Sequence, residues 1–293
     1  ADIQSSADKK QYRRSTGKVM EQKKKVLFVA TVVKTHINTF HLPFLKMFKE
    51  YGWEVHVAAK NDFVDEPCVI PNCDRHFDID FARSPFSKSN IKAYKQLKQI
   101  IETNHYDIIH CHTPVAGVLT RLAARTAKGT TVIYTAHGFH FYQGAPLINW
   151  LVYYPVERVC GKFTDKLITI NQEDYHRANS WRLRNNGKIY YVPGIGVDLE
   201  EIQNISINKV QKKKEIGISN DVKVLLSVGE LNKNKNHEII IRVLSKLTNK
   251  NFIYLICGNG ELKEYLKNLA KELGVSDKVK FLGYRKDVLE IYK

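Results

Sequence analysis

The chain has 293 residues, 43% of them hydrophobic, which is enough for sizeable cores and excludes a fibrous or wholly disordered protein. At about 150 residues per domain, this length predicts two domains. The formal net charge of +16 suits phosphate-bearing ligands, anionic membrane surfaces or nucleic acid, and does not choose among them.

The five cysteines are scattered, odd in number and form no CxxC pair, which predicts reduced thiols in a cytoplasmic protein. The sequence contains no signal-peptide pattern and no uncharged apolar run of the about 18 residues that a membrane-spanning helix needs. The expected location is therefore the cytoplasm, either as a soluble protein or in peripheral contact with the inner face of the cell membrane. Residues 1–22 are rich in Lys, Arg and Ser, and we expect them to form a disordered leader.

The first folded segment has the pattern of a βαβ unit. Residues 26–32 are a continuous apolar run, which is typical of a parallel strand covered on both faces. A polar turn that contains His36, a helical pattern from Phe40 and a strand at 53–59 complete the unit. Because the first loop lacks glycine, a Rossmann site for nicotinamide or flavin is not expected.

The following segment contains one weak candidate for a metal site. We expect residues 61–89 to be irregular, and they include Asp78 and Asp80 in an Asp-x-Asp pattern. Such a pair needs a third ligand before it holds a divalent ion. The helix predicted at 90–103 has an apolar face and a lysine face, as in a helix that packs on a core.

Histidines occur where two later strands end. A strand that ends at His112 also carries His110 on the same face, because residues i and i+2 of a strand point the same way. A strand at 130–134 leads His137 into a turn at Gly138, and ligands bind at this edge of open parallel sheets. We interpret His112 as an edge residue near His137, and His110 as a packing residue.

These residues allow two functional interpretations. A metal-dependent hydrolase would use His110, His112, His137 and His140, but it needs further ligands and no acidic partner stands out nearby. A non-catalytic protein that binds phosphate or nucleic acid would need interleaved basic and aromatic residues, whereas the lysine runs lie mostly in the leader and on helices. Both alternatives stay open from these residues alone, and the expectation of no metal, no cofactor and no nucleic acid rests on a resemblance to a known family.

The second half of the chain begins a new αβ pattern. The segment 144–158 is aromatic and amphipathic, which suits packing on the sheet or contact with an apolar acceptor at a membrane. A turn rich in Pro and Gly, followed by a polar Lys/Asn stretch, predicts a hinge or linker at 193–220. Domains are thus expected at 23–192 and 221–293, the second with strands at 222–228, 252–257 and 279–282.

A loop in the second predicted domain has the composition of an anion site. Lys233, Lys235 and His237 lie between a strand and a helix. Loop amides, a helix N-terminus and lysine side chains together favour an anion, and a diphosphate is the natural ligand.

Taken together, these segments resemble the family 4 glycosyltransferases of GT-B fold, most closely the bacterial members that act in capsular and exopolysaccharide assembly. The resemblance covers residues 24–293 and is carried by His36-Ile37-Asn38-Thr39-Phe40-His41 and by residues 107–121, 135–139, 144–174, 196–198, 227–237 and 255–284. It implies two Rossmann-like αβα domains that face a cleft, with the second domain incomplete at its C-terminus.

The resemblance implies a retaining transfer of a sugar from a nucleotide diphosphate donor, a UDP-sugar, to a glycan or polyprenyl-linked acceptor, without a bound metal. His137 matches the histidine that lies beside the transferred sugar in this family. His36, His112 and Gly138 are expected on the acceptor side of the cleft. Family members continue past the position of Lys293, so the chain is expected to be a fragment, or a truncated and inactive protein.

The resemblance also assigns the donor site. Lys235 matches the lysine of the diphosphate-binding loop, which here begins at Gly229. Glu230 stands where the family has an arginine, and we expect Lys233 to substitute for that cation. The residues expected to hold the nucleotide base lie at the ends of later strands: Gly258, Gly260, Tyr284 and Arg285.

Overall fold

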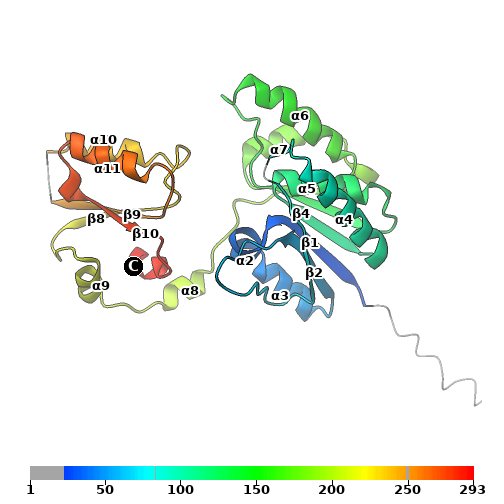
Figure 1. Cartoon of the computed structure of the whole chain (residues 1–293), viewed down its shortest axis with the longest axis horizontal. Coiled ribbons are helices and arrows are strands. Elements are labelled where there is room, and N and C mark those ends of the chain that lie inside the picture. The colour runs from blue at the N-terminus through cyan, green and yellow to red at the C-terminus, as the bar shows by residue number, and fades with distance from the viewer. Residues whose placement is uncertain (1–22, 83, 249–250) are drawn as a thin grey trace, which may run out of the picture. The chain divides into compact units, whose positions relative to one another are not determined.

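A computed structural model describes residues 23–82, 84–248 and 251–293 of the chain, so the predicted leader at 1–22 lies outside the described residues. The chain divides into two compact units between Gly196 and Val197 (Figure 1). Each unit is an α/β fold with a parallel sheet of its own, as the sequence predicts.

The first unit is built on a seven-stranded sheet in the order β3-β2-β1-β4-β5-β6-β7, in which every neighbouring pair is parallel. Its strands are β1 Lys25–Val32, β2 Glu54–Lys60, β3 Arg75–Asp78, β4 Ile108–His112, β5 Thr131–Ala136, β6 Lys166–Thr169 and β7 Lys188–Tyr191. The strand order reverses between β1 and β4, and the carboxyl edge at this switch point is where open α/β sheets bind ligands.

Helices connect these strands. They are the π-helical turn η1 Val33–Ile37, α2 Asn38–Phe40, α3 Leu42–Glu50, α4 Ser89–Asn104, α5 Pro114–Ala123, α6 Leu147–Gly161 and α7 Gln172–Ala178, with short 3-10 turns at Ala124–Thr126 and Arg184–Asn186. None of the helices in the described part of the chain has both the length and the apolar character needed to cross a membrane.

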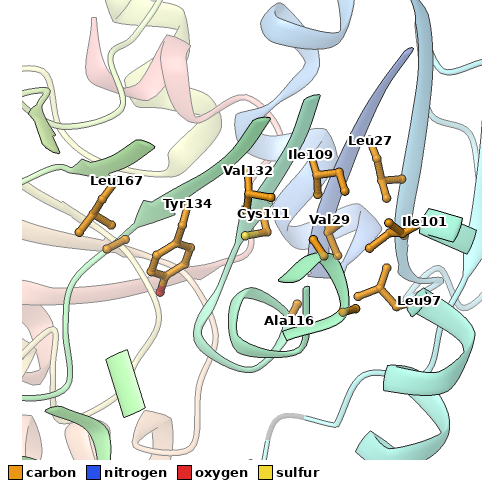
Figure 2. Packing of buried hydrophobic residues seen from close by; sticks show 14 of the residues in the cluster. Leu27, Val29, Leu97, Ile101, Ile109, Cys111, Ala116, Val132, Tyr134 and Leu167 are labelled. Atoms are coloured by element: carbon orange, nitrogen blue, oxygen red, sulfur yellow. The ribbon is translucent and has the colours of Figure 1, made fainter. Parts of the chain in front are cut away.

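Both faces of the central strand β1 are buried, because alternate side chains of a strand point to opposite faces. Leu27 and Val29 belong to one core cluster, together with Leu97 of α4. Figure 2 shows these side chains packed on one side of the sheet. Val26 and Phe28 belong to a second cluster on the other face. This double burial explains the continuous apolar run in the sequence.

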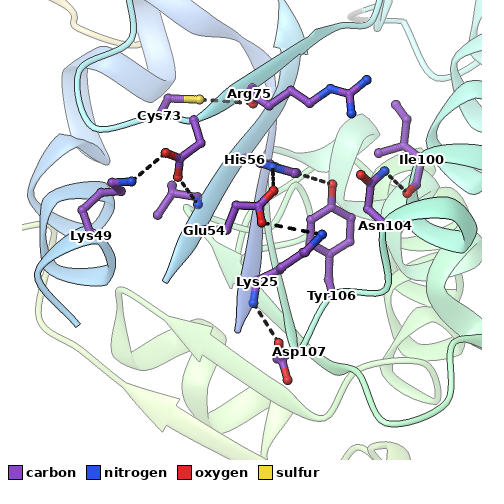
Figure 3. A network of polar contacts seen from close by, with 12 residues as sticks. Lys25, Lys49, Glu54, His56, Cys73, Arg75, Ile100, Asn104, Tyr106 and Asp107 are labelled. Atoms are coloured by element: carbon purple, nitrogen blue, oxygen red, sulfur yellow. Dashed lines mark hydrogen bonds and ion pairs between the residues drawn. The ribbon is translucent and has the colours of Figure 1, made fainter. Parts of the chain in front are cut away.

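A polar network fixes the amino ends of the strands, opposite the edge where ligands are expected (Figure 3). The backbone nitrogen of Lys25 donates to Asp107 Oδ2 over 2.8 Å. The ring of buried His56 hydrogen-bonds on one side to the Tyr106 hydroxyl at 2.8 Å and on the other to Glu54 at 2.7 Å. These contacts join β1, β2 and the residues that precede β4.

The second unit has a three-stranded parallel sheet in the order β10-β9-β8, formed by β8 Lys223–Val228, β9 Phe252–Cys257 and β10 Val279–Gly283. Its helices are α8 Leu199–Asn204, α9 Lys209–Ile216, α10 His237–Lys246, α11 Lys263–Glu272 and α12 Val288–Tyr292, with a 3-10 turn at Ser276–Lys278. Leu231 and Ile241 pack with Tyr254 and Leu266 in its core.

Two segments contain more structure than the sequence predicts. The region 61–89, expected to be irregular, contains β3, a short strand whose side chains are at most partly buried. The region 193–220, expected to be a linker, contains α8 and α9. Helix α9 is polar, and it is capped at one end by Asn208, which accepts a hydrogen bond from the Gln211 amide, and at the other by Gly217 with φ +74°.

Candidate functional site

Four histidines meet at the carboxyl edge of the first sheet. His36 lies on η1 after β1, His41 lies between α2 and α3, His112 ends β4, and His137 follows β5. One ring nitrogen from each residue lies within 4.8 Å of those of the other three. We call this group the histidine cluster. It lies at the carboxyl ends of the neighbouring strands β1 and β4, between which the strand order of the sheet reverses.

The four rings are in mutual contact. His41 and His112 stack with their ring centroids 3.8 Å apart. His137 Nε2 and His112 Nδ1 are 3.3 Å apart in a hydrogen bond, so one of the two nitrogens carries the proton. The ring of His36 meets that of His137 edge to face at a centroid distance of 5.2 Å.

Local backbone geometry brings the cluster together. In η1, Val33 and Ile37 are fully buried, and this burial holds the turn against the sheet. Thr113 has φ +62°, which is rare for a β-branched residue. Its hydroxyl donates to the His112 carbonyl over 2.6 Å and accepts from the Thr31 amide at 3.2 Å. These bonds join the ends of β1 and β4 and compensate the backbone strain.

Burial keeps the cluster neutral. Burial, and then the neighbouring histidines, lower the pKa of His36 to about 4 and that of His41 to about 2. The same causes hold the pKa of His112 well below its usual value, and burial lowers that of His137. All four rings are therefore uncharged near neutral pH.

Several of these buried nitrogens make no hydrogen bond. Among the described residues, those without a partner include His36 Nε2, both ring nitrogens of His41, and His112 Nε2. An unpaired buried polar atom costs about 1–3 kcal/mol, so these nitrogens are available to hydrogen-bond a water or a ligand.

The cluster differs in part from the sequence-based interpretation. His112 lies beside His137, as predicted. His110 is bonded to Thr135 Oγ1 at 2.8 Å and lies outside the group. His140 is exposed, with its ring against Tyr153, and also lies outside it. The metal site considered from the sequence therefore shares only two histidines with the cluster.

His41 was missed as a site residue. Its five-residue separation from His36 matches neither a helix face nor a strand face, so no periodicity pairs the two side chains. The sequence offered one indication that His41 belongs to the site: it forms, with His36, a pair of histidines close to the start of a helix and shortly after a buried strand.

An apolar cavity of about 500 Å³ lies beside the cluster in the first unit. His36 and Gly138 form part of its wall. Other lining residues are Thr31, Phe86, Val118, Phe139, Tyr153 and Val156. Glu157 also lines the cavity, and buried Arg121 binds it at 2.8 Å. The cavity can therefore accept an apolar group next to the histidines.

The Asp-x-Asp pair has other partners. Asp78 Oδ1 accepts from the Asn61 amide at 2.9 Å, and Asp80 forms an ion pair with Lys60 at 2.6 Å. Asp78 thus joins the end of β3 to the residue after β2, and Asp80 joins the segment after β3 to the end of β2.

In the second unit, the loops after all three strands are bonded to one another. The Gly229 amide donates to the Cys257 carbonyl at 2.9 Å, and the Gly258 amide donates to the Gly283 carbonyl at 2.7 Å. The approach is so close that a Cβ on Gly258 would lie 1.9 Å from the Gly229 carbonyl oxygen. The predicted diphosphate loop and the predicted base-binding turns are therefore hydrogen-bonded to one another along one edge of the sheet.

The lysines of this edge are exposed. Lys233 and Lys235 form no ion pair within the described part of the chain, and the Lys235 amide is bonded to Asn232 Oδ1 at 3.0 Å. The Glu230 side chain accepts from Asn232 at 2.9 Å. His237, the first residue of α10, is buried and contacts the Tyr254 hydroxyl and the Glu230 carbonyl, each at 3.3 Å. The loop thus presents cations beside a helix N-terminus.

The predicted base-binding residues of the last turn differ from each other. Tyr284 is exposed. The Arg285 guanidinium is bonded to Asp287 at 2.7 Å and to Glu215 at 3.0 Å. Arg285 therefore holds α9 against the turn, and Tyr284 is the freer of the two for a ligand.

Comparison with known proteins defines the class. Residues 25–171 match the family described as Glycosyl transferase 4-like, and residues 208–293 match the Glycosyl transferases group 1 family. The chain therefore belongs to the family 4 glycosyltransferases, whose fold is GT-B.

Similar proteins agree with this class. EpsD of Bacillus subtilis (strain 168), which is named as a glycosyltransferase, is 45% identical over 92% of this chain and 70% of its own length. The UDP-Gal:alpha-D-GlcNAc-diphosphoundecaprenol alpha-1,3-galactosyltransferase of Escherichia coli is 34% identical over 70% of this chain and 53% of its own length. The crystal structure of Anabaena Alr3699/HepE with UDP and glucose superimposes with a TM-score of 0.63 at 20% identity, covering 92% of this chain and 71% of that one.

Proposed function

We propose that this chain belongs to a retaining glycosyltransferase that moves a hexose from a UDP-sugar to a lipid-linked glycan acceptor during surface polysaccharide assembly. The observation that carries the proposal is the exposed lysine loop at the start of α10. This loop is bonded to the turn after β9, and that turn is bonded to the end of β10. The Escherichia coli relative is named for a UDP-Gal donor and a diphosphoundecaprenol acceptor, and HepE was solved with UDP and glucose.

In this proposal Lys235 binds the donor diphosphate. As the bond between the sugar and the diphosphate breaks, negative charge builds on the departing diphosphate. A cation placed there in advance stabilises the transition state more than the ground state. Lys233 supplies a second cation where Glu230 replaces the family's arginine, and the N-terminus of α10 adds its partial positive charge.

His137 orients the sugar in this proposal. Its neutral ring can donate or accept one hydrogen bond to a sugar hydroxyl, which lowers the entropy cost of reaching the transition state. No metal takes part in the transfer. The nucleotide base would rest on Gly258, Gly260 and Tyr284.

The acceptor would use the first unit. The cavity bordered by His36 and Gly138 is apolar, and we assign it to an apolar part of the acceptor. Helix α6 leaves Leu147, Ile148 and Leu151 exposed. We propose that these side chains contact the surface of an anionic membrane that carries a polyprenyl-linked acceptor.

Calorimetric titration with UDP, without added metal, tests the donor site. We expect saturable binding that Lys235→Ala weakens by roughly tenfold to a hundredfold, because a hydrogen bond to a charged group is worth about 1.5–3 kcal/mol. Lys271→Ala, at an exposed position on α11, is the matched control and should bind as the parent does. Equal affinity of the parent and Lys235→Ala, or no binding by folded protein, would contradict the assignment.

A further inference from the structure

A second histidine holds His137, the residue that we propose orients the sugar. His137 Nε2 and His112 Nδ1 are 3.3 Å apart in a hydrogen bond. His112 is the last residue of β4 and is only 1% exposed, whereas His137 follows β5 and is partly buried. The two strands are parallel neighbours, with His112 opposite Thr135, so this bond joins the ends of adjacent strands.

The ring of His112 is packed among other rings. It stacks on His41 at a centroid distance of 3.8 Å, and its plane lies 6° from that of Phe28 at a centroid distance of 6.3 Å. The His110 ring is 4.2 Å away. A close-packed interior leaves such a ring little room to rotate, so Nδ1 of His112 stays directed at His137.

The proton of His112 has one favourable position. Burial, more than the neighbouring histidines, holds the pKa of His112 well below its usual value, so the ring is neutral and carries a single proton. Its Nε2 is buried and has no partner among the described residues. A proton on Nε2 would be a buried N–H without an acceptor, which is rare in folded proteins. The proton therefore belongs on Nδ1, which donates it to His137 Nε2.

This hydrogen bond determines the tautomer of His137. Because Nε2 of His137 accepts, the proton of its own neutral ring must be on Nδ1. His137 Nδ1 bonds to none of the described residues, and unlike His112 Nε2 it is not enclosed by the protein. An N–H donor is thus open to a ligand at the carboxyl edge of the sheet.

We propose that His112 is a positioning residue that fixes His137 as a hydrogen-bond donor. His137 Nδ1 then donates to an oxygen of the transferred sugar, and the ring does not act as a general base because its Nε2 lone pair is occupied by His112. The site would select a sugar with a hydroxyl at this point over one with a deoxy carbon or an ammonium group, since neither accepts a hydrogen bond. The identity of the ligand rests on the proposed function, whereas the tautomer does not.

¹⁵N NMR of the full chain, labelled at histidine, tests the tautomer, because protonated and bare ring nitrogens have well-separated chemical shifts. We expect His137 of the parent to carry its proton on Nδ1 at neutral pH. The loss of its signals in His137→Gln assigns them. His176→Gln changes an exposed histidine and is the control, which should leave the signals of His137 unchanged.

Two substitutions of His112 separate hydrogen bonding from packing. His112→Phe keeps an aromatic ring against His41 but removes the donor, and it should move the proton of His137 to Nε2, the form that a free histidine side chain favours in water. His112→Asn places an amide N–H near the position of Nδ1 and should keep the proton of His137 on Nδ1. Circular dichroism checks folding, and if His112→Phe does not fold, the spectrum of the parent decides.

The inference is overturned if His137 of the folded parent carries its proton on Nε2, or if folded His112→Phe keeps that proton on Nδ1. Both His112 variants should bind UDP as the parent does, because Lys235 belongs to the second unit. Failure of the proposed transfer would appear in the UDP titration, and failure of the tautomer assignment would appear in the NMR spectrum, so the two are distinguishable.

Discussion

His56 couples the stability of the first unit to pH. Its buried ring lies between Glu54 and Tyr106 at the amino edge of the sheet. Burial lowers the pKa of His56 below its usual value of 6.5, and the hydrogen bond that the ring donates to Glu54 offsets only part of this effect. Because the unfolded chain then binds a proton that the folded chain does not, stability is lost as pH falls below about 6.5.

We expect His56→Gln to remove this part of the pH dependence. Between pH 7 and pH 5 the parent should lose up to about 1.4 kcal/mol per pH unit more than the variant, because glutamine does not titrate. Urea unfolding followed by tryptophan fluorescence measures the difference. The exposed His176→Gln is the control and should keep the slope of the parent. Identical slopes for all three proteins would show that His56 is protonated equally in both states.

At the scale of elements, the loops after β8 and β9 depend on glycine. Gly258 has φ +146°, and a Cβ there would collide with the Gly229 carbonyl; a Cβ on Gly260 would lie 2.4 Å from the Leu231 carbonyl oxygen. We expect Gly258→Ala and Gly260→Ala each to destabilise the second unit by at least about 1–3 kcal/mol. Calorimetry should show the unfolding transition of the second unit at a lower temperature. The unfolding of the first unit, which contains Trp53, Trp150 and Trp181 and is followed by tryptophan fluorescence, should be unchanged.

Gly229→Ala is the matched control for these substitutions. A Cβ at this position meets only the flexible Lys235 side chain at 3.5 Å, so the transition should move little. Equal stability of Gly258→Ala and Gly229→Ala would contradict the close approach of the loops after β8 and β9.

Elements with strong hydrophobic patterns were predictable, and elements without one were not. Strand β1 is buried on both faces, and its apolar run identifies it in the sequence. Strand β3 has only four residues, Arg75–Asp78, and its ends are exposed, so neither alternation nor an apolar run marks it. Helix α9 buries only Ile216, and its caps were the sole local indication.

The candidate site was predictable as far as it depends on strand ends. Ligands bind at the carboxyl edge of parallel sheets, and this rule predicted that His112 and His137 lie close together. The position of His41 depends on the π-helical turn η1, which has no pattern in the sequence. The ion pairs of Arg285 with Asp287 and Glu215 are tertiary contacts, and nothing in the local sequence distinguishes this arginine from a free one.

At the scale of the whole molecule, the chain combines a net positive charge with exposed apolar side chains. Residues 1–25 carry eight Lys or Arg and three acids, so +11 of the net charge belongs to the remaining residues. On α6, Leu147 is 73% exposed and Leu151 is 65% exposed. Anionic lipid attracts the charge, and the apolar side chains of a surface helix then enter the headgroup boundary.

We expect the chain from residue 23 onward to sediment with anionic vesicles at low salt and to be released as the ionic strength rises. Leu147→Glu combined with Leu151→Glu should reduce the bound fraction severalfold, because two carboxylates replace the apolar contacts. Ile239→Glu, at an exposed position on α10, is the control. Binding that is unaffected by the α6 substitutions would exclude this helix as the contact.

The order of strands in the first sheet also determines when this unit can fold. Strand β1 pairs with β4, and Val26 lies opposite Ile108, so the central pair of the sheet joins residues 82 positions apart. During synthesis, β1 and β2 emerge early, but β1 lacks its second neighbour until β4 follows. Such non-local parallel pairing folds slowly, and one edge of β1 stays open meanwhile. A nascent chain that stops before β4 would expose that edge to self-association.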